Sequence, residues 1–81
     1  MATLEKAIAI AAAAHAGQVD KAGQPYILHP IRVMLSVTGS HAQMAAILHD
    51  VVEDTSVTVD QLVDEGFPAE VVTAEIGRAH V

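Results

Sequence analysis

Apolar side chains recur at three- and four-residue steps near the start of the chain, which is the period of an α-helix. The residues on this face are Leu4, Ala7, Ile8, Ala11 and His15. Thr3 is suited to cap the amino end of the helix, and Gly17 is suited to end it. Because only two of the 81 residues are aromatic, the core has to be built from small aliphatic side chains. This favours closely packed helices over a sandwich or barrel and predicts one small all-α domain.

Glycines and prolines divide the rest of the chain into further short helices. Residues Gln18–Gln24 form a polar loop, and the two prolines of Pro25–Pro30 confine that segment to an extended or turn conformation. Four more helices follow, with Pro30 opening the first of them and Ser40 capping the second. Their predicted extents are Pro30–Gly39, Ser40–Asp54, Thr58–Gly66 and a stretch that begins at Pro68. The sequence therefore predicts about five helices.

The stretch His49–Thr55 places one imidazole and three carboxylates within six consecutive residues, with no lysine or arginine among them. If the predicted helix continues through Asp54, the polar side chains share roughly 140° of its circumference. These residues are His49, Asp50, Glu53 and Asp54. A solvated helix would carry charges of both signs there. The types present are those of metal ligands and of general acids and bases, so this stretch is the first candidate for a functional site.

Three polar residues elsewhere can each have either a structural or a functional role. His29 stands at a helix entrance on stiff backbone, and together with His49 and Asp50 it suits a borderline divalent metal. His15 ends the apolar face of the first helix, and we interpret it as a buried histidine hydrogen-bonded to backbone. Lys21 is the only basic residue of the polar loop. It is either solvated or a contact to a substrate phosphate or base.

Charge and composition exclude several kinds of partner. The net charge of −6 argues against nucleic acid, because phosphates need a basic surface. The absence of cysteine excludes disulfides and thiolate zinc sites and fits a reducing compartment. The longest apolar run, Ala7–Ala14, is too short to span a bilayer. We therefore expect a soluble cytoplasmic protein with no membrane partner.

Three segments taken together resemble the HD-domain phosphohydrolases, and most closely the guanosine tetraphosphate hydrolase domain of the RelA/SpoT family. They are Ala14–Gln18, Gly23–Pro30 and Leu48–Thr55, and the resemblance covers nearly all of Leu4–Val72. It implies an all-α HD-domain helical bundle and a divalent metal, usually manganese. The implied substrate is a phosphorylated nucleotide, and the implied reaction releases pyrophosphate from the 3′ position of guanosine tetra- or pentaphosphate.

The resemblance also implies roles for particular residues. The implied metal ligands are His29, His49 and Asp50; the acidic pair at the attacking water is Glu53 and Asp54; and the implied substrate contact is Lys21. Tyr26 occupies a matching position too, and we interpret it as a packing residue. The loop Asp20-Lys21-Ala22 departs from the family, which often has Arg-Lys-Ser there. An HD hydrolase of another phosphorylated nucleotide, or a non-catalytic regulatory module that binds metal or nucleotide, therefore remains an alternative. So does a helical bundle whose charged motif is only a solvated face.

The end of the chain carries its own expectation. The family supplies a further metal-ligand aspartate from a later helix, and nothing after Asp60 matches that motif. Codons ATC GGA AGA GCA CAC GTC can encode Ile76–Val81, and this string matches a common sequencing adapter. We expect residues 1–74 to be the N-terminal part of an HD hydrolase domain and residues 75–81 to be a read-through tail. The 81-residue chain by itself is then expected to be weakly active or inactive.

Overall fold

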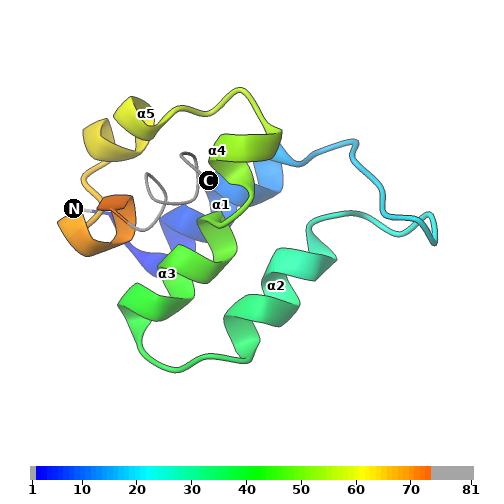
Figure 1. Ribbon diagram of the computed structural model, residues 1–81, viewed down its shortest axis with the longest axis horizontal. Coiled ribbons are helices and arrows are strands. Elements are labelled where there is room, and N and C mark those ends of the chain that lie inside the picture. The colour runs from blue at the N-terminus through cyan, green and yellow to red at the C-terminus, as the bar shows by residue number, and fades with distance from the viewer. Residues whose placement is uncertain (1, 74–81) are drawn as a thin grey trace.

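The computed structural model describes residues 2–73 and contains five labelled helices in that range (Figure 1). They are α1 (Leu4–Ala14), α2 (Leu28–Leu35), α3 (Ser40–Leu48), α4 (Val51–Asp54) and α5 (Val59–Asp64). Residues 69–73 are also helical. Extended pairing within residues 2–73 is limited to one isolated antiparallel bridge between Val19 and Pro25. The all-α prediction is confirmed, whereas the predicted boundary after residue 74 and the predicted tail lie outside the described residues.

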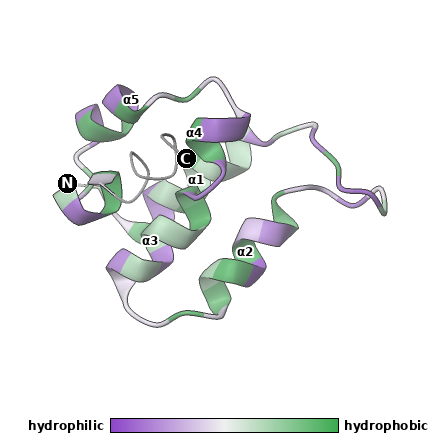
Figure 2. Cartoon of the chain, in the orientation of Figure 1, coloured by the Kyte–Doolittle hydropathy of each residue, from purple (hydrophilic) through white to green (hydrophobic). Residues whose placement is uncertain are grey.

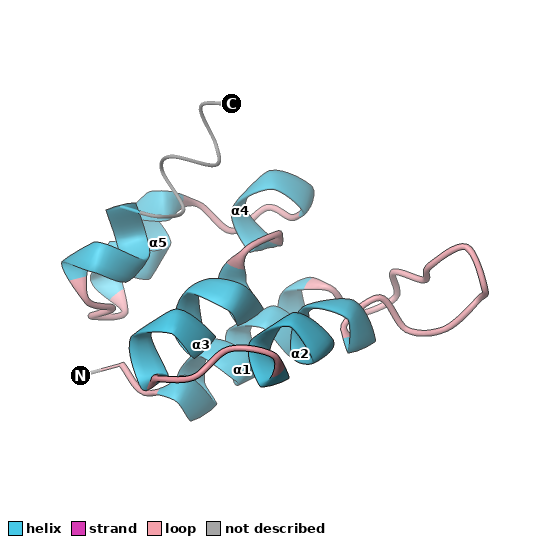
Figure 3. Cartoon of the chain, turned by 60° about the horizontal axis from the view of Figure 1, so that its bottom comes forward, coloured by secondary structure: helices cyan, strands magenta, loops and turns pink. Residues whose placement is uncertain are grey.

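Helix α3 is the centre of the bundle, because it packs against both α1 and α2. Ile47 and Leu48 of α3 are fully buried, and Ala7 and Ala11 of α1 are buried to the same degree. The contact between α1 and α3 therefore buries small alanine side chains of α1, as the aliphatic composition predicted. Figure 3 shows α1, α2 and α3 lying together, with α4 and α5 above them. None of the described helices is long and apolar enough to cross a membrane.

Most predicted helix ends agree with the structure. The Thr3 hydroxyl accepts a hydrogen bond from the Lys6 amide at 3.1 Å, and Thr58 caps α5 reciprocally with Gln61. Gly66 ends α5 with a φ of +87°, a conformation that glycine adopts without strain. Two starts were wrong by one or two residues, and the predicted end of the second helix at Gly39 was wrong by four, because α2 ends at Leu35. Helix α2 begins at Leu28 with Pro30 inside its first turn, where the missing N–H has no partner to lose. Helix α3 is capped by Gly39, and Ser40 is its first residue.

The prediction of one continuous helix through Asp54 was wrong. Helix α3 ends at Leu48, and α4 begins at Val51 after a turn made by His49 and Asp50. The His49 amide bonds to the Ala46 carbonyl, three residues back, and Asp50 has φ −102° and ψ −2°. The tertiary contact of Asp50 with Tyr26 outweighs a weak local preference for helix, since aspartate is a poor residue for a helix interior. The four polar residues therefore do not share one helix face.

Candidate functional site

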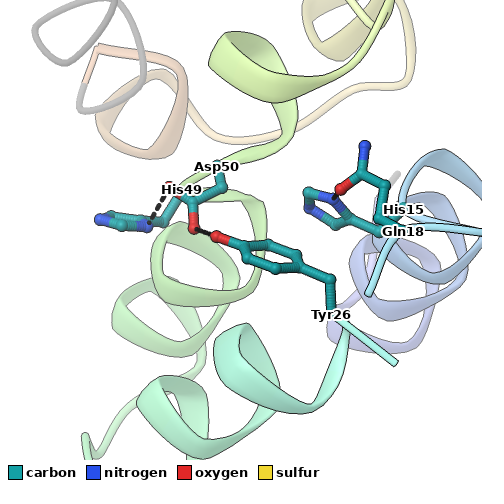
Figure 4. A network of polar contacts seen from close by, with 5 residues as sticks. All are labelled: His15, Gln18, Tyr26, His49 and Asp50. Atoms are coloured by element: carbon teal, nitrogen blue, oxygen red, sulfur yellow. Dashed lines mark hydrogen bonds and ion pairs between the residues drawn. The ribbon is translucent and has the colours of Figure 1, made fainter. Parts of the chain in front are cut away.

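Asp50 is the centre of the polar residues at the α3–α4 turn. Its side chain is buried, with 6% of the residue exposed, although it carries a carboxylate. Oδ2 accepts a hydrogen bond from the Tyr26 hydroxyl at 2.5 Å, and Oδ1 lies 3.0 Å from Nδ1 of His49. Figure 4 shows Tyr26 and His49 approaching Asp50 from different directions. A buried carboxylate is costly unless it is paired, so these contacts are what allow Asp50 to lie there.

The structure brings together only part of the predicted metal-binding set. His49 and Asp50 are in contact, and the His49 side chain is 30% exposed. His29 is exposed in the first turn of α2, where its ring centre lies 5.8 Å from that of Tyr26. Within residues 2–73, no three histidine, aspartate or glutamate side chains are gathered closely enough to hold a metal ion. The predicted roles of all three residues stay predictions.

The chemistry of the donor atoms nevertheless fits a divalent cation. Imidazole nitrogen and carboxylate oxygen are ligands for transition metals and for zinc. The fit therefore rests on the types of residue present, because the His49 Nδ1 and Asp50 Oδ1 atoms are in direct contact with each other at 3.0 Å and Nδ1 is buried.

The acidic pair lies one helical turn beyond Asp50. Glu53 and Asp54 are both exposed on α4, where Figure 2 shows a hydrophilic stretch next to hydrophobic residues of the same helix. The Asp54 amide donates to the Asp50 carbonyl at 2.9 Å, and the Asp54 carbonyl accepts a hydrogen bond from Gln18 Nε2 at 3.1 Å. The two carboxylates thus follow the His49–Asp50 pair by one helical turn of backbone and remain exposed.

Lys21 lies on a loop that projects away from the helices (Figure 1). The Asp20 carboxylate accepts hydrogen bonds from the amides of Ala22 and Gln24, at 2.9 and 3.0 Å. The Asp20 amide in turn bonds to the Gln24 carbonyl at 2.9 Å. Asp20, which departs from the family pattern, therefore holds the loop in shape and leaves Lys21 exposed beside it. No contact between Lys21 and the His49–Asp50 pair is seen in the part of the chain that the structure describes.

The loop geometry predicts the effect of removing the Asp20 carboxylate. Asp20→Ala should speed hydrogen exchange of the Ala22 and Gln24 amides about tenfold, because each loses a charge-assisted hydrogen bond. The control is Asp64→Ala, which removes an exposed carboxylate at the end of α5. In the control, NMR should measure the same exchange rates for these two amides as in the wild-type chain. Equal rates in the wild-type chain and in Asp20→Ala would show that the carboxylate does not order the loop.

Two residues at the site were misjudged from the sequence. His15 is buried as expected, with 2% exposed, but Nδ1 lies 2.8 Å from the Gln18 side-chain oxygen, where a bond to backbone was predicted. Tyr26 was interpreted as packing, and its ring does pack 5.0 Å from that of His15. Its hydroxyl also holds Asp50. The signal was available, because a partly buried tyrosine needs a partner for its hydroxyl.

Comparison with known proteins adds a family to this geometry. A family profile described as HD domain matches residues 7–74. A guanosine-3′,5′-bis(diphosphate) 3′-pyrophosphohydrolase of Haemophilus influenzae is 48% identical over 60 residues, which are 69% of this chain and 9% of that protein. A protein of the same name from Borreliella burgdorferi is 42% identical over 72 residues, which are 84% of this chain and 11% of that protein. The bifunctional (p)ppGpp synthase/hydrolase SpoT of Escherichia coli is 40% identical over 63 residues, which are 73% of this chain and 9% of that protein. The chain spans about a tenth of the length of these curated relatives.

Proposed function

The chain belongs to the HD-domain family, and from that premise we propose that it contributes the metal centre of a guanosine tetraphosphate 3′-pyrophosphohydrolase. The observation that carries the proposal is the buried Asp50 carboxylate, which lies 3.0 Å from an imidazole nitrogen and is followed, one helical turn later, by two exposed acids. The names of the relatives support the choice of substrate. The proposed reaction removes pyrophosphate from the 3′ position of guanosine tetra- or pentaphosphate, in the cytoplasm and as part of the stringent response.

His49 and Asp50, together with His29, are the proposed ligands of a divalent cation, which we take to be Mn²⁺. When bound, the cation lowers the pKa of a coordinated water and offsets phosphate charge. Asp50 brings a full negative charge to this position, and Tyr26 fixes the orientation of its carboxylate. The two imidazoles add neutral nitrogen donors, a mixture that suits a borderline metal.

The acids on α4 have the proposed role of handling the proton of the attacking water. Glu53 and Asp54 are exposed, so water and substrate can reach them. A carboxylate within hydrogen-bond distance of the water accepts its proton or orients it, and such groups contribute about 10²- to 10⁴-fold to a rate. Lys21 is the proposed contact to a substrate phosphate. The ordered loop presents its ammonium group to solvent without a carboxylate partner from Asp20, which is engaged with backbone.

The test uses the product of the complete gene, assayed for pyrophosphate release from guanosine tetraphosphate with Mn²⁺. We expect turnover by the wild-type protein and none by His49→Ala. Release of orthophosphate or triphosphate from another nucleotide, with guanosine tetraphosphate left intact, would favour the alternative HD hydrolase. Tight nucleotide binding without hydrolysis would favour the regulatory module. Turnover by His49→Ala equal to that of the wild-type protein would contradict the metal assignment.

A further inference from the structure

Gln18 links three segments that meet at the candidate site. Its amide donates to the His15 carbonyl at 3.0 Å, and its own carbonyl accepts from the Tyr26 amide at 2.9 Å. Its side-chain oxygen lies 2.8 Å from His15 Nδ1, and its side-chain nitrogen donates to the Asp54 carbonyl at 3.1 Å. One residue therefore connects the end of α1, the segment before α2 and the end of α4. No role for Gln18 or His15 follows from the family resemblance.

These contacts determine which nitrogen of His15 carries the proton. The Asp54 carbonyl can only accept, so the amide nitrogen of Gln18 must face it. The amide oxygen of Gln18 then faces His15, and an oxygen of this kind can only accept as well. Nδ1 of His15 is consequently the donor. The other ring nitrogen, Nε2, is buried and has no hydrogen-bond partner among residues 2–73.

The second consequence concerns Tyr26, which is held at three points. Its amide bonds to Gln18, its ring packs 5.0 Å from the His15 ring, and its hydroxyl donates to Asp50 at 2.5 Å. Figure 4 shows the His15–Gln18 pair on one side of Tyr26 and the His49–Asp50 pair on the other. A shift of His15 and Gln18 would therefore move both Tyr26 and the Asp54 carbonyl at the end of α4.

We propose that His15 and Gln18 are positioning residues, which hold the Asp50 carboxylate through Tyr26 and hold the acidic helix α4 through the Asp54 carbonyl. Neither residue is among the proposed metal ligands, acids or substrate contacts. The catalytic consequence rests on the proposed function, because it assumes that Asp50 and the α4 acids act on one substrate. Misplacement by about 1 Å is enough to cost about 10²-fold in rate when reacting groups have to be aligned.

The first experiment measures the tautomer of His15 in the wild-type chain. Long-range ¹H–¹⁵N NMR of the imidazole distinguishes a protonated Nδ1 from a protonated Nε2. We expect the proton on Nδ1, with Nε2 bare. A proton found on Nε2 of the neutral ring would overturn the proposal, because the Gln18 amide could then not bridge His15 to Asp54. This result needs neither a variant nor catalytic activity.

The second experiment compares two glutamine variants that remove the same side-chain amide. Gln18→Met is nearly the same size and loses both side-chain hydrogen bonds. Gln43→Met is the matched control, since Gln43 Nε2 also donates to a backbone carbonyl, that of Val37 at 3.3 Å, and this contact lies at the opposite end of α3 from His49 and Asp50. We expect Gln18→Met to weaken Mn²⁺ binding about 10- to 100-fold, because residues that hold the metal ligands in place have effects of that size when they are replaced. The control should bind Mn²⁺ with the affinity of the wild-type chain. Equal Mn²⁺ affinity in both variants would overturn the proposal.

A rescue experiment separates positioning from general stability. His15→Asn places an amide N–H near the position of Nδ1, whereas His15→Leu supplies no donor. In the product of the complete gene, we expect kcat to fall about 10²-fold in His15→Leu with KM little changed, and to recover in part in His15→Asn. If both variants lower kcat equally, the proposal fails while the proposed function stands. If the wild-type protein has no hydrolytic activity, the proposed function fails, and the tautomer and the Mn²⁺ affinities still decide the positioning role.

Discussion

Replacing Asp50 by asparagine should lower pyrophosphate release by the product of the complete gene about 10³-fold. A bound metal contributes several kcal/mol to such a reaction, and each 1.36 kcal/mol is a factor of ten. Asparagine has nearly the shape of aspartate, and its carbonyl oxygen can still accept the Tyr26 hydroxyl. The substitution therefore removes the charge of the proposed ligand while leaving the fold and the Tyr26 contact in place.

The control for this prediction is Asp64→Asn, which removes one negative charge from an exposed position at the end of α5. The control should retain wild-type turnover, because Asp64 lies on a different helix from the predicted site residues. Turnover by Asp50→Asn within about twofold of the control would contradict the role of Asp50. Circular dichroism of both variants shows whether the helical fold is retained.

The second large effect is on stability. Leu48→Ala should lower the free energy of unfolding by about 3 kcal/mol, because the Leu48 side chain is fully buried. An 81-residue domain has a total stability of only about 4 to 12 kcal/mol, so the variant loses a large part of it. Leu48 also directly precedes His49. The loss of packing under the α3–α4 turn should therefore loosen the site as well as the core.

Urea denaturation of Leu48→Ala and Leu35→Ala measures this effect with matched chemistry. Leu35 is 71% exposed at the end of α2, so the same deletion there should change the free energy of unfolding by less than about 0.5 kcal/mol. Equal losses in the two variants would show that α3 does not form the core of the bundle.

The helices could be predicted because their signals are local. The apolar spacing of α1, the threonine caps and the glycine that follows α5 each depend on a few neighbouring residues, and the structure has them within one or two positions. The break between α3 and α4 could not be predicted this way. His49 and Asp50 continue a helical pattern in the sequence, and the turn reflects contacts of Asp50 with Tyr26, which lies 24 residues earlier.

The candidate site shows the same division. The residue types of His49 to Asp54 identified the chemistry, and a family resemblance supplied the roles, but neither contained the contacts that support the site. Gln18 looked like an ordinary loop residue, and its bond to the Asp54 carbonyl joins positions 36 residues apart. Asp20 counted as a departure from the family until the structure showed it bonding to two amides of its own loop. Contacts of this kind depend on the tertiary fold and leave no periodic signal.

Titration of the chain with Mn²⁺, followed by NMR, tests the metal assignment most directly. The paramagnetic ion broadens the resonances of nearby nuclei. Even when binding is weak, the broadened resonances therefore identify the residues that lie next to the ion. We predict that the first signals to broaden belong to His29, His49 and Asp50, followed by Tyr26 and the α4 acids, and that Asp50→Asn abolishes this pattern. Broadening centred on the acidic end of α5, at Asp64 and Glu65, with His49 and Asp50 unaffected, would contradict the assignment.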